Sequence, residues 1–385
     1  MTTTSNAPAR TSALSRDRII KAAYQIAKKD PNDALSMRKI ATKLKVTPMA
    51  IYKYFSDKSE LIAAVVDHQM TESDLIPDNI DHSDWRSWVK ESFLRMWDAY
   101  DSSPGMAQYM SHATSFGPAV LNWQNETLKV LITAGLTPKQ ALTAHAAMAE
   151  LATGSTILVP IRQQGVEKVF PTISKDLNDA LSMRKIATKL KVTPMAIYKY
   201  FSDKSELIAA VIDHQMNETN LIPHELDSTD WRKWIKESFL RMWDAYDGAP
   251  GMAQYMSHAT SFGPAVLNWQ NETLKVLITA GLTPKQALTA HAAMAELATG
   301  STILVPVRQQ GVEKVFPTIW NDLKAGKAPD LSELNNGPVS VVDYPWLLMC
   351  GQAMLENMHN SRDAFSAELD LILDGLTLQL AENKK

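Results

Sequence analysis

The chain has 385 residues, of which 45% are hydrophobic and 21% charged, and its formal net charge is −3. This composition is typical of an ordinary globular protein and argues against a disordered or collagen-like chain. Eighteen consecutive apolar residues occur nowhere, and the first thirty residues contain no apolar run of signal-peptide length, so we expect a cytoplasmic protein without membrane contact. The single cysteine, Cys350, fits a reducing compartment and a buried apolar position rather than a nucleophile.

The charge is unevenly distributed along the chain. Residues 1–60 contain twelve Lys or Arg and five Asp or Glu, a net charge of +7, which leaves −10 on the remainder. A basic N-terminal part on an acidic body favours a polyanionic partner. A solvated lysine-rich surface is the alternative reading of the same count.

A long repeat organises most of the chain. A shift of 146 positions aligns residues 32–173 with residues 178–319, and 128 of these 142 positions are identical. A period of this length is domain-sized and far exceeds that of solenoid repeats. The pattern favours an in-frame tandem duplication, and an assembly artefact of the sequence is the alternative.

The apolar periodicity is helical nearly throughout, which predicts an all-α protein. A first helix is expected from Ser15 to about Pro31. Ser36 caps a second helix, and Thr47 followed by Pro48 opens a short third helix. Two short helices joined by so tight a turn, with a longer helix before them, predict a helix-turn-helix.

Amphipathic helices are expected along the rest of the chain. Their approximate ranges are 57–72, 84–100, 119–134 and 138–162, the same ranges 146 residues later, and 345–358 and 362–382. Residues 325–338, rich in Gly, Pro and Asn, form the best linker candidate. The expected domains are a flexible tail (1–14), a helix-turn-helix head (15–62), a first helical ligand-binding-like domain (63–177), a second helix-turn-helix without its first helix (178–208) and a second ligand-binding and dimerisation domain (209–385).

The helix-turn-helix pattern suggests how DNA would be bound. In such a motif the second helix enters the major groove with its first residues at the base edges, while neighbouring groups hold phosphates. Residues 47–50 are small or apolar and would read thymine methyl groups and shape, and Arg38 is the candidate for a guanine contact. The candidate DNA-binding residues are Arg38, Thr47, Pro48, Met49, Ala50, Tyr52, Lys53, Tyr54 and Lys58 in the first head, and Arg184, Thr193, Met195, Tyr198, Lys199, Tyr200 and Lys204 in the second.

The run LSMRKIATKLKVTPMAIYKYFSDKSELI resembles the DNA-binding domain of TetR/AcrR-type transcriptional regulators. DWRSWVKESFLRMWDAYDSSPGMAQYM and FSAELDLILDGL resemble the ligand-binding and dimerisation domain of the tetracycline-repressor branch. The resemblance implies a repressor released from a palindromic operator when a small molecule enters the helical core and tilts the helix that begins near Asp57. Lys45 departs from the family, which usually has Gly in the turn, and costs about 1 kcal/mol if its φ is positive.

Methionine and aromatic side chains of the body could line an effector pocket, because such mixtures suit adaptable ligand sites. For each side chain, an ordinary core position is the alternative. The candidates are Met96, Trp97, Tyr100, Met106, Tyr109, Met110, His112, Phe116, Trp123, His145 and Met148 in the first unit, and Trp243, Tyr246, Tyr255, Met256, His258, Phe262, Trp269, His291 and Met294 in the second.

The sequence gives no support for catalysis. The histidines lack the spacing of a zinc site, and no glycine-rich phosphate loop or nucleophile elbow is present. We therefore expect no metal, no cofactor and no enzymatic activity. A helical enzyme is retained only as an alternative class of function.

The two C-terminal helices carry an apolar stripe that is large for a terminal helix pair. The family resemblance implies a homodimer joined by a four-helix bundle at this position. Burial against the chain's own body is the alternative. The stripe consists of Tyr344, Trp346, Leu347, Met354, Phe365, Leu369, Ile372 and Leu376.

The two heads are not expected to be equivalent, because the second unit begins after the place of the first helix. Residues 166–173 could substitute for that helix, but Pro171 would interrupt it at about 3 kcal/mol. We therefore expect the first heads of two chains to bind the operator. The alternatives are an internal pseudo-dimer, whose two heads reach grooves about 34 Å apart, and a degenerate regulator with one or no working head.

Overall fold

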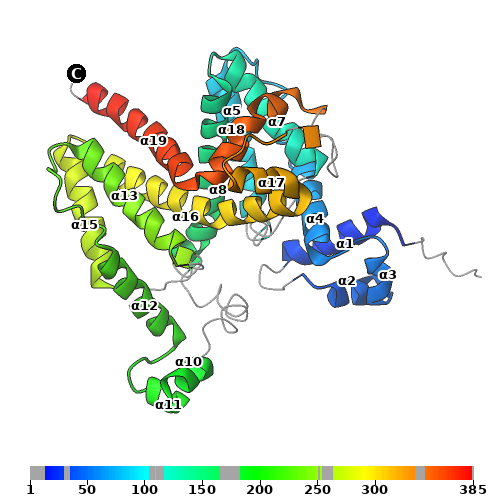
Figure 1. Cartoon of the computed structure of the whole chain (residues 1–385), viewed down its shortest axis with the longest axis horizontal. Helices are drawn as coiled ribbons and strands as arrows, with labels where there is room; N and C mark the ends of the chain where they lie inside the picture. The colour runs from blue at the N-terminus through cyan, green and yellow to red at the C-terminus, as the bar shows by residue number, and fades with distance from the viewer. Residues whose placement is uncertain are drawn as a thin grey trace, which may run out of the picture.

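The computed structural model describes residues 14–29, 35–103, 109, 117–164, 183–249, 252–253, 263–330, 332–333 and 343–383. Within these ranges the secondary structure is helical and contains no strand, which confirms the predicted all-α class (Figure 1). The helices form a compact head at the N-terminus, a second small head in mid-chain, and a body to which both units contribute.

The first unit contains a three-helix head followed by a helical body. The helix ends agree with the predicted ends to within two residues, because capping side chains such as Ser36 and Asp57 accept hydrogen bonds from the first helical turn. Its helices are α1 (Arg16–Lys29), α2 (Met37–Leu44), α3 (Pro48–Tyr52), α4 (Lys58–Glu72), α5 (Trp85–Asp101), α7 (Pro118–Thr133) and α8 (Pro138–Gln164).

The second unit repeats this order without a described counterpart of α1 and adds three helices. Its helices are α10 (Met183–Leu190), α11 (Pro194–Ile197), α12 (Lys204–Thr219), α13 (Trp231–Asp247), α15 (Pro264–Thr279), α16 (Pro284–Val315), α17 (Pro317–Lys324), α18 (Pro345–His359) and α19 (Ser361–Asn383). Two features differ from the sequence analysis. Helix α16 continues past Pro306 instead of ending near residue 308, and α17 had not been predicted.

The two units meet along α8 and α16, which pack directly against each other. A Cβ atom built on Gly154 would lie 2.1 Å from the carbonyl oxygen of Glu296, and one built on Gly300 would lie 2.1 Å from that of Glu150. The repeat exchanges these two contacts, so the helices cross with pseudo-twofold symmetry. The backbones approach this closely because glycine has no side chain.

The hairpin of α18 and α19 is shared between the units. Helix α18 packs on α7 and α8 of the first unit, whereas α19 packs on α13 and α16 of the second and also contacts α8 (Figure 1). Leu347 and Cys350 belong to the core of the first unit, and Phe365 and Leu369 to the core of the second. The hairpin therefore fastens the two units to each other.

The stripe expected to join two chains is covered by its own chain. Leu347, Phe365 and Leu369 are at most 2% exposed and Leu376 is 6% exposed. The remaining members are partly buried and pack against the same cores; they are Tyr344, Trp346, Met354 and Ile372. The apolar stripe is thus accounted for by contacts within one chain, which corrects the reason for expecting a contact between two chains there.

A buried ionic group lies where α8, α16 and α19 meet. Arg308 donates to Glu150 over 2.6 Å, and Glu150 is 1% exposed. Burial and the neighbouring Glu150 carboxylate raise the pKa of the Glu368 carboxyl well above its usual range. Removing one partner of such a buried pair costs about 3–5 kcal/mol, because the other charge is left buried without compensation.

Replacing Gly300 by Ala should destabilise the body, because its methyl group would meet the Glu150 carbonyl on α8. Overpacking of this kind costs about 1–3 kcal/mol. The expected result is a lower urea midpoint in an unfolding curve followed by circular dichroism.

Gly375 provides the matched control, because it lies in α19 and a Cβ there would meet nothing within 4 Å. Gly375→Ala should leave stability unchanged or raise it by about 0.5–1 kcal/mol through helix propensity. If Gly300→Ala were as stable as Gly375→Ala, the close contact of α8 and α16 would be refuted.

Candidate nucleic-acid interface

The first head has a complete core beneath its helix-turn-helix. Ile19 and Ala23 of α1, Ile40 of α2, Ile51 of α3 and Leu61 of α4 are all 0% exposed. Side chains spaced three or four residues apart on α1 face the other helices, as its apolar periodicity predicts. The core therefore holds α2 and α3 in a fixed relation to each other.

Lys45, in the turn between α2 and α3, has the left-handed backbone conformation in which the family usually places glycine. Its φ is 57° and its ψ is 42°, in the left-handed region, and its N–H points to the carbonyl groups of Ala41 and Thr42. Lys191 repeats this conformation in the second head with a φ of 55°. A lysine in this conformation costs about 1 kcal/mol more conformational free energy than a glycine, and the chain tolerates that cost in both heads.

The outer face of α2 and α3 is exposed and cationic. Between residues 35 and 58 the chain has six Lys or Arg and one acidic residue, Asp57. Met49 is 71% exposed and Tyr52 is 45% exposed. Of the other candidate DNA-binding residues, the structure exposes Arg38, Thr47, Lys53 and Lys58 and half-buries Pro48 and Ala50. One face therefore combines positive charge with an accessible helix start.

Tyr54 has a role inside the head that its sequence position did not indicate. Its hydroxyl donates to the Leu14 carbonyl over 2.7 Å, and its own carbonyl accepts from Arg16 at 2.5 Å. Arg16 also forms a salt bridge with Glu60 and lies 4.2 Å from the centre of the Phe55 ring. These contacts tie α1 to the end of α3.

The second head repeats the same exposed positions on a smaller core. The structure exposes Arg184, Thr193, Met195, Tyr198 and Lys199. The described core of this head consists of Met183, Ala187, Ile197 and Leu207, with Ile186 and Phe201 packed against it. The side chain of Lys204 and the residues expected to replace the first helix, 166–173, lie outside the described part.

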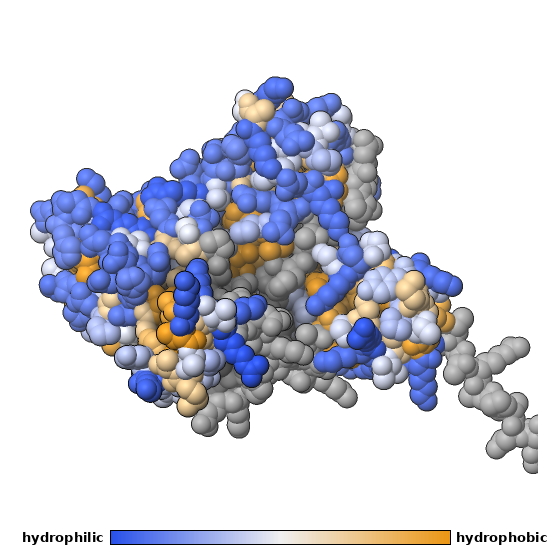
Figure 2. All heavy atoms as spheres, turned by 60° about the horizontal axis from the view of Figure 1, so that its bottom comes forward, coloured by the Kyte–Doolittle hydropathy of each residue, from blue (hydrophilic) through white to orange (hydrophobic). Residues whose placement is uncertain are grey.

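Side chains that the first head covers are exposed in the second. Tyr200, the counterpart of Tyr54, is 79% exposed. Leu190 and Val192 are 63% and 45% exposed, whereas their counterparts in the first head pack against its core. Figure 2 shows apolar side chains at the surface in this region. The second head thus leaves in water apolar side chains whose counterparts pack against the core of the first head.

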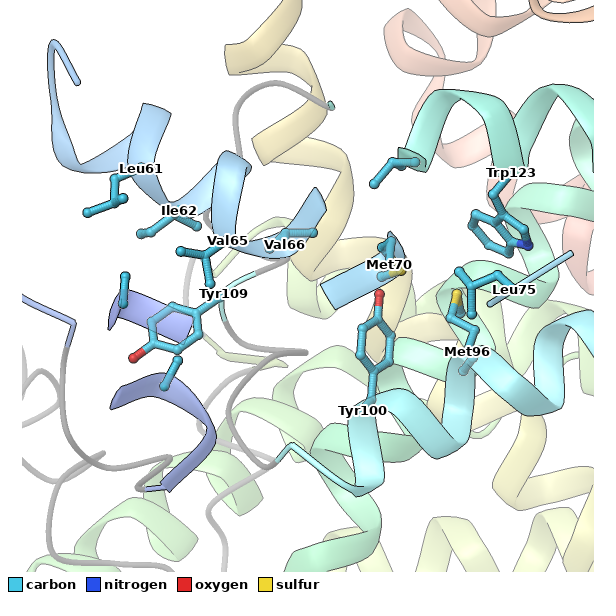
Figure 3. Packing of buried hydrophobic residues seen from close by; sticks show 14 of the residues in the cluster. Leu61, Ile62, Val65, Val66, Met70, Leu75, Met96, Tyr100, Tyr109 and Trp123 are labelled. Carbon is cyan, nitrogen blue, oxygen red and sulfur yellow. The ribbon is translucent and has the colours of Figure 1, made fainter. Parts of the chain in front are cut away.

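Helix α4 connects the first head to the body. Figure 3 shows its apolar side chains running from Leu61 in the head to Met70, near Met96 and Trp123 of the body. Asp67 accepts hydrogen bonds from the first backbone N–H groups of α7, at 2.8 Å from Ala119. A displacement of the start of α7 would therefore act directly on α4.

The candidate effector residues include a hydrogen-bonded aromatic cluster. Trp123 donates to Ser92 over 2.8 Å, and the His145 ring centre lies 5.0 Å from that of Trp123 and 5.6 Å from that of Phe93. Burial lowers the pKa of His145 to about 3, so its imidazole is neutral. Its Nδ1 atom has no hydrogen-bond partner among the described atoms. Trp269 and His291 form the same pair in the second unit, 4.9 Å apart.

The other candidate effector residues that the structure describes are buried or half-buried. Tyr109 accepts a hydrogen bond from the Leu35 N–H and lies against the head rather than in the aromatic cluster (Figure 3). Trp97 and Trp243 donate to Ser155 and Ser301. Tyr100, Tyr246 and Met294 are buried and Met148 is half-buried. Met106, Met110, His112, Phe116, Tyr255, Met256, His258 and Phe262 lie outside the described residues.

Metal-ligand clusters and membrane-spanning helices are both absent from the described ranges. No three His, Cys, Asp or Glu side chains in those ranges lie close enough together to hold a metal ion. No helix in the same ranges is long and apolar enough to cross a membrane.

Sequence comparisons match both parts of the chain to known families. The model of bacterial regulatory proteins of the tetR family matches residues 19–65 and 179–211, and that of the tetracyclin repressor-like C-terminal domain matches residues 223–380. Over these residues the chain resembles tetR-family regulators. The family match covers the α1–α4 head and recurs on α10–α12, the second head.

Individual relatives match about a third of the chain. The HTH-type transcriptional repressor DrrR1 of Streptomyces coeruleorubidus is 27% identical over 34% of this chain and 48% of its own length. The tetracycline repressor protein class G of Vibrio anguillarum is 31% identical over 32% of this chain and 59% of its own length. The crystal structure of TetR from Acinetobacter baumannii AYE is 22% identical, with a TM-score of 0.34, and covers 50% of this chain and 100% of that chain. The chain thus spans about half the length of the curated relatives it matches.

Removing the Tyr54 hydroxyl should loosen the first head. Tyr54→Phe loses the hydrogen bond to Leu14 and leaves that carbonyl without its partner, at about 0.5–1.5 kcal/mol. We expect faster amide hydrogen exchange in α1. Tyr200→Phe is the matched control and should change nothing, because Tyr200 is exposed. Equal effects of both substitutions would contradict the role assigned to Tyr54.

Proposed function

We propose that the protein is a DNA-binding transcriptional regulator, a repressor whose first head binds an operator. The observation that carries this proposal is the complete first head, whose exposed face presents six Lys or Arg around the start of α3. The relatives named as repressors support it. A fixed cationic helix-turn-helix is suited to the major groove of double-stranded DNA.

Each exposed group of the first head has a distinct expected role. Tyr52, Lys53 and Lys58 would hold phosphates and supply the salt-dependent part of the affinity. Met49 at 71% exposure would contact thymine methyl groups, and Arg38 would supply a donor fork for guanine. Sequence preference would therefore rest on few donors and on apolar contacts.

The two heads would contribute unequally to this binding. The second head presents the same residues but exposes Tyr200, Leu190 and Val192. Their counterparts in the first head, Tyr54, Leu44 and Val46, pack against its core. Without this burial the second head is less stable locally. Part of the free energy of DNA binding would then be spent on ordering the head, which lowers its affinity. Since the α18–α19 stripe is covered within the chain, we infer that one chain brings both heads to DNA and that the first carries most of the affinity.

An effector would act through the connection between the body and α4. A small molecule entering the core near Trp123 and His145 would find a neutral imidazole with an unpaired Nδ1 atom. Movement of α7 by such a ligand would be passed to α4 through Asp67, which holds the first N–H groups of α7. The tilt of α4 would then move the head away from its operator.

The test is a matched pair of substitutions at equivalent positions of the two heads. Tyr52 and Tyr198 are 45% and 44% exposed, so neither substitution by Ala should unfold the protein. In a gel-shift assay on the protein's own promoter region at several salt concentrations, Tyr52→Ala should weaken binding by about tenfold or more. Tyr198→Ala should have a much smaller effect.

Other outcomes would count against parts of the proposal. Equal losses from the two substitutions would show that both heads carry the affinity. An absence of salt-sensitive binding by the unaltered protein would overturn the proposed function itself.

A further inference from the structure

The two units share one α18–α19 hairpin, although their surfaces are built from nearly the same residues. Residues 117–160 and 263–306, which cover α7 with most of α8 and α15 with most of α16, are identical in the two units. Each surface that the hairpin covers on one unit therefore has a counterpart of the same chemistry on the other. The exposure of these counterparts shows whether anything fills them.

Helix α18 occupies a well-defined seat on the first unit. The Trp346 N–H donates to the Asn125 side chain over 3.0 Å, and the Cys350 thiol lies 3.4 Å from the Pro138 carbonyl. Beneath the helix, Asn125 and Leu142 are 6% and 4% exposed. The seat thus consists of one face of α7 continued by the first turns of α8.

The same seat on the second unit is open. Leu288, the counterpart of Leu142, is 53% exposed, and Asn271, the counterpart of Asn125, is exposed. Leu267 and Ile278 lie along the same face of α15 and are 52% and 42% exposed. These apolar side chains, with the Asn271 amide among them, correspond to the surface that α18 covers on the first unit.

A groove marks the far end of the open seat. On the first unit, the Tyr344 hydroxyl at the start of α18 lies 3.4 Å from the Pro118 carbonyl at the start of α7. On the second unit, the corresponding place is a groove between α12 and α15 lined by Asp213, His214 and Pro264 among others. The groove is where the leading tyrosine of an added helix would lie.

Helix α19 occupies a second seat, this time on the second unit. Leu240 and Trp243 of α13 are 8% and 3% exposed, and the Trp243 ring stacks on Phe365. Asp370 of α19 pairs with Arg232 at 3.1 Å and with Lys236 at 2.6 Å. This seat therefore combines an apolar floor with two cations.

The counterpart of this second seat, on α5 of the first unit, is also open. Leu94, which corresponds to Leu240, is 47% exposed, and Trp97 is half-buried. Arg86 and Lys90, the counterparts of the two cations, are exposed and form no salt bridge with any described residue. A Cβ on Gly135 would meet nothing within 4 Å, whereas one on its counterpart Gly281 would lie 3.4 Å from α19.

We propose that these two open surfaces form one docking site for a second α18–α19-type hairpin, supplied by another polypeptide. Its first helix would cover the apolar row on α15 and α16, and its second would place acidic side chains against Arg86 and Lys90 of α5. The pseudo-twofold crossing of α8 and α16 relates this site to the filled one. A copy of this chain that donated its own hairpin would open an equal surface on itself, so the occupant is a polypeptide with a hairpin to spare.

The test adds a labelled peptide of residues 343–383 to the full chain and follows fluorescence anisotropy. The chain's own hairpin is held at a high effective concentration by its covalent link, so the peptide reaches the open site rather than the filled one. We expect saturable binding of one peptide per chain. Leu288→Glu and Leu94→Glu should each lower the affinity by about tenfold or more.

Leu378→Glu is the matched control, because Leu378 is 68% exposed on the outer face of α19 and lies outside both open seats. It should leave peptide affinity unchanged. All three side chains are exposed, and unchanged circular dichroism and melting temperature verify that each variant folds. Absence of peptide binding, or binding that Leu288→Glu and Leu94→Glu leave unaltered, would overturn the proposal. So would self-association of the chain that Leu288→Glu abolishes, since the occupant would then be a second copy.

Discussion

The close crossing of α8 and α16 is the contact on which the rest of the structure depends. Each helix places a glycine against a carbonyl group of the other, Gly154 against Glu296 and Gly300 against Glu150. Because the repeat supplies the same glycine twice, one sequence feature serves both sides of the crossing. Once the two helices are paired, α19 can lie across both of them and α18 can reach the first unit. The bodies of the two units are then joined by contacts within a single chain.

The boundaries of the repeat explain why the two halves differ in structure while their sequences are nearly the same. The second unit begins after the place of α1, so its head exposes Tyr200 where the first head bonds Tyr54 to Leu14. The first unit ends before the C-terminal hairpin and obtains α18 from the second unit. The missing hairpin is thus replaced only in part, by α18, and the missing first helix leaves apolar surface exposed on the second head.

Local features were predictable from the sequence because they depend on neighbouring residues. Ser36 caps a helix where predicted, a helix begins beside Asp57 as expected, and Lys45 has the positive φ that the sequence analysis had considered as a condition. Contacts across long separations were not predictable. Nothing beside Tyr54 indicated that its hydroxyl would bond a residue 40 positions away, and an apolar stripe on α19 has the same pattern whether its partner is a second chain or α13. The continuation of α16 past Pro306 likewise reflects its packing rather than local propensity.

The central claim is that the two units pair within one chain and bury Leu347, Phe365, Leu369 and Leu376 of the α18–α19 stripe in their own cores. Multi-angle light scattering of the purified protein at micromolar concentration tests this most directly. The account predicts a monomer with the chain mass of 42.7 kDa. A stable particle of twice that mass, reduced to the monomer by a charged substitution of Leu369 or Phe365 that leaves the fold intact, would contradict it.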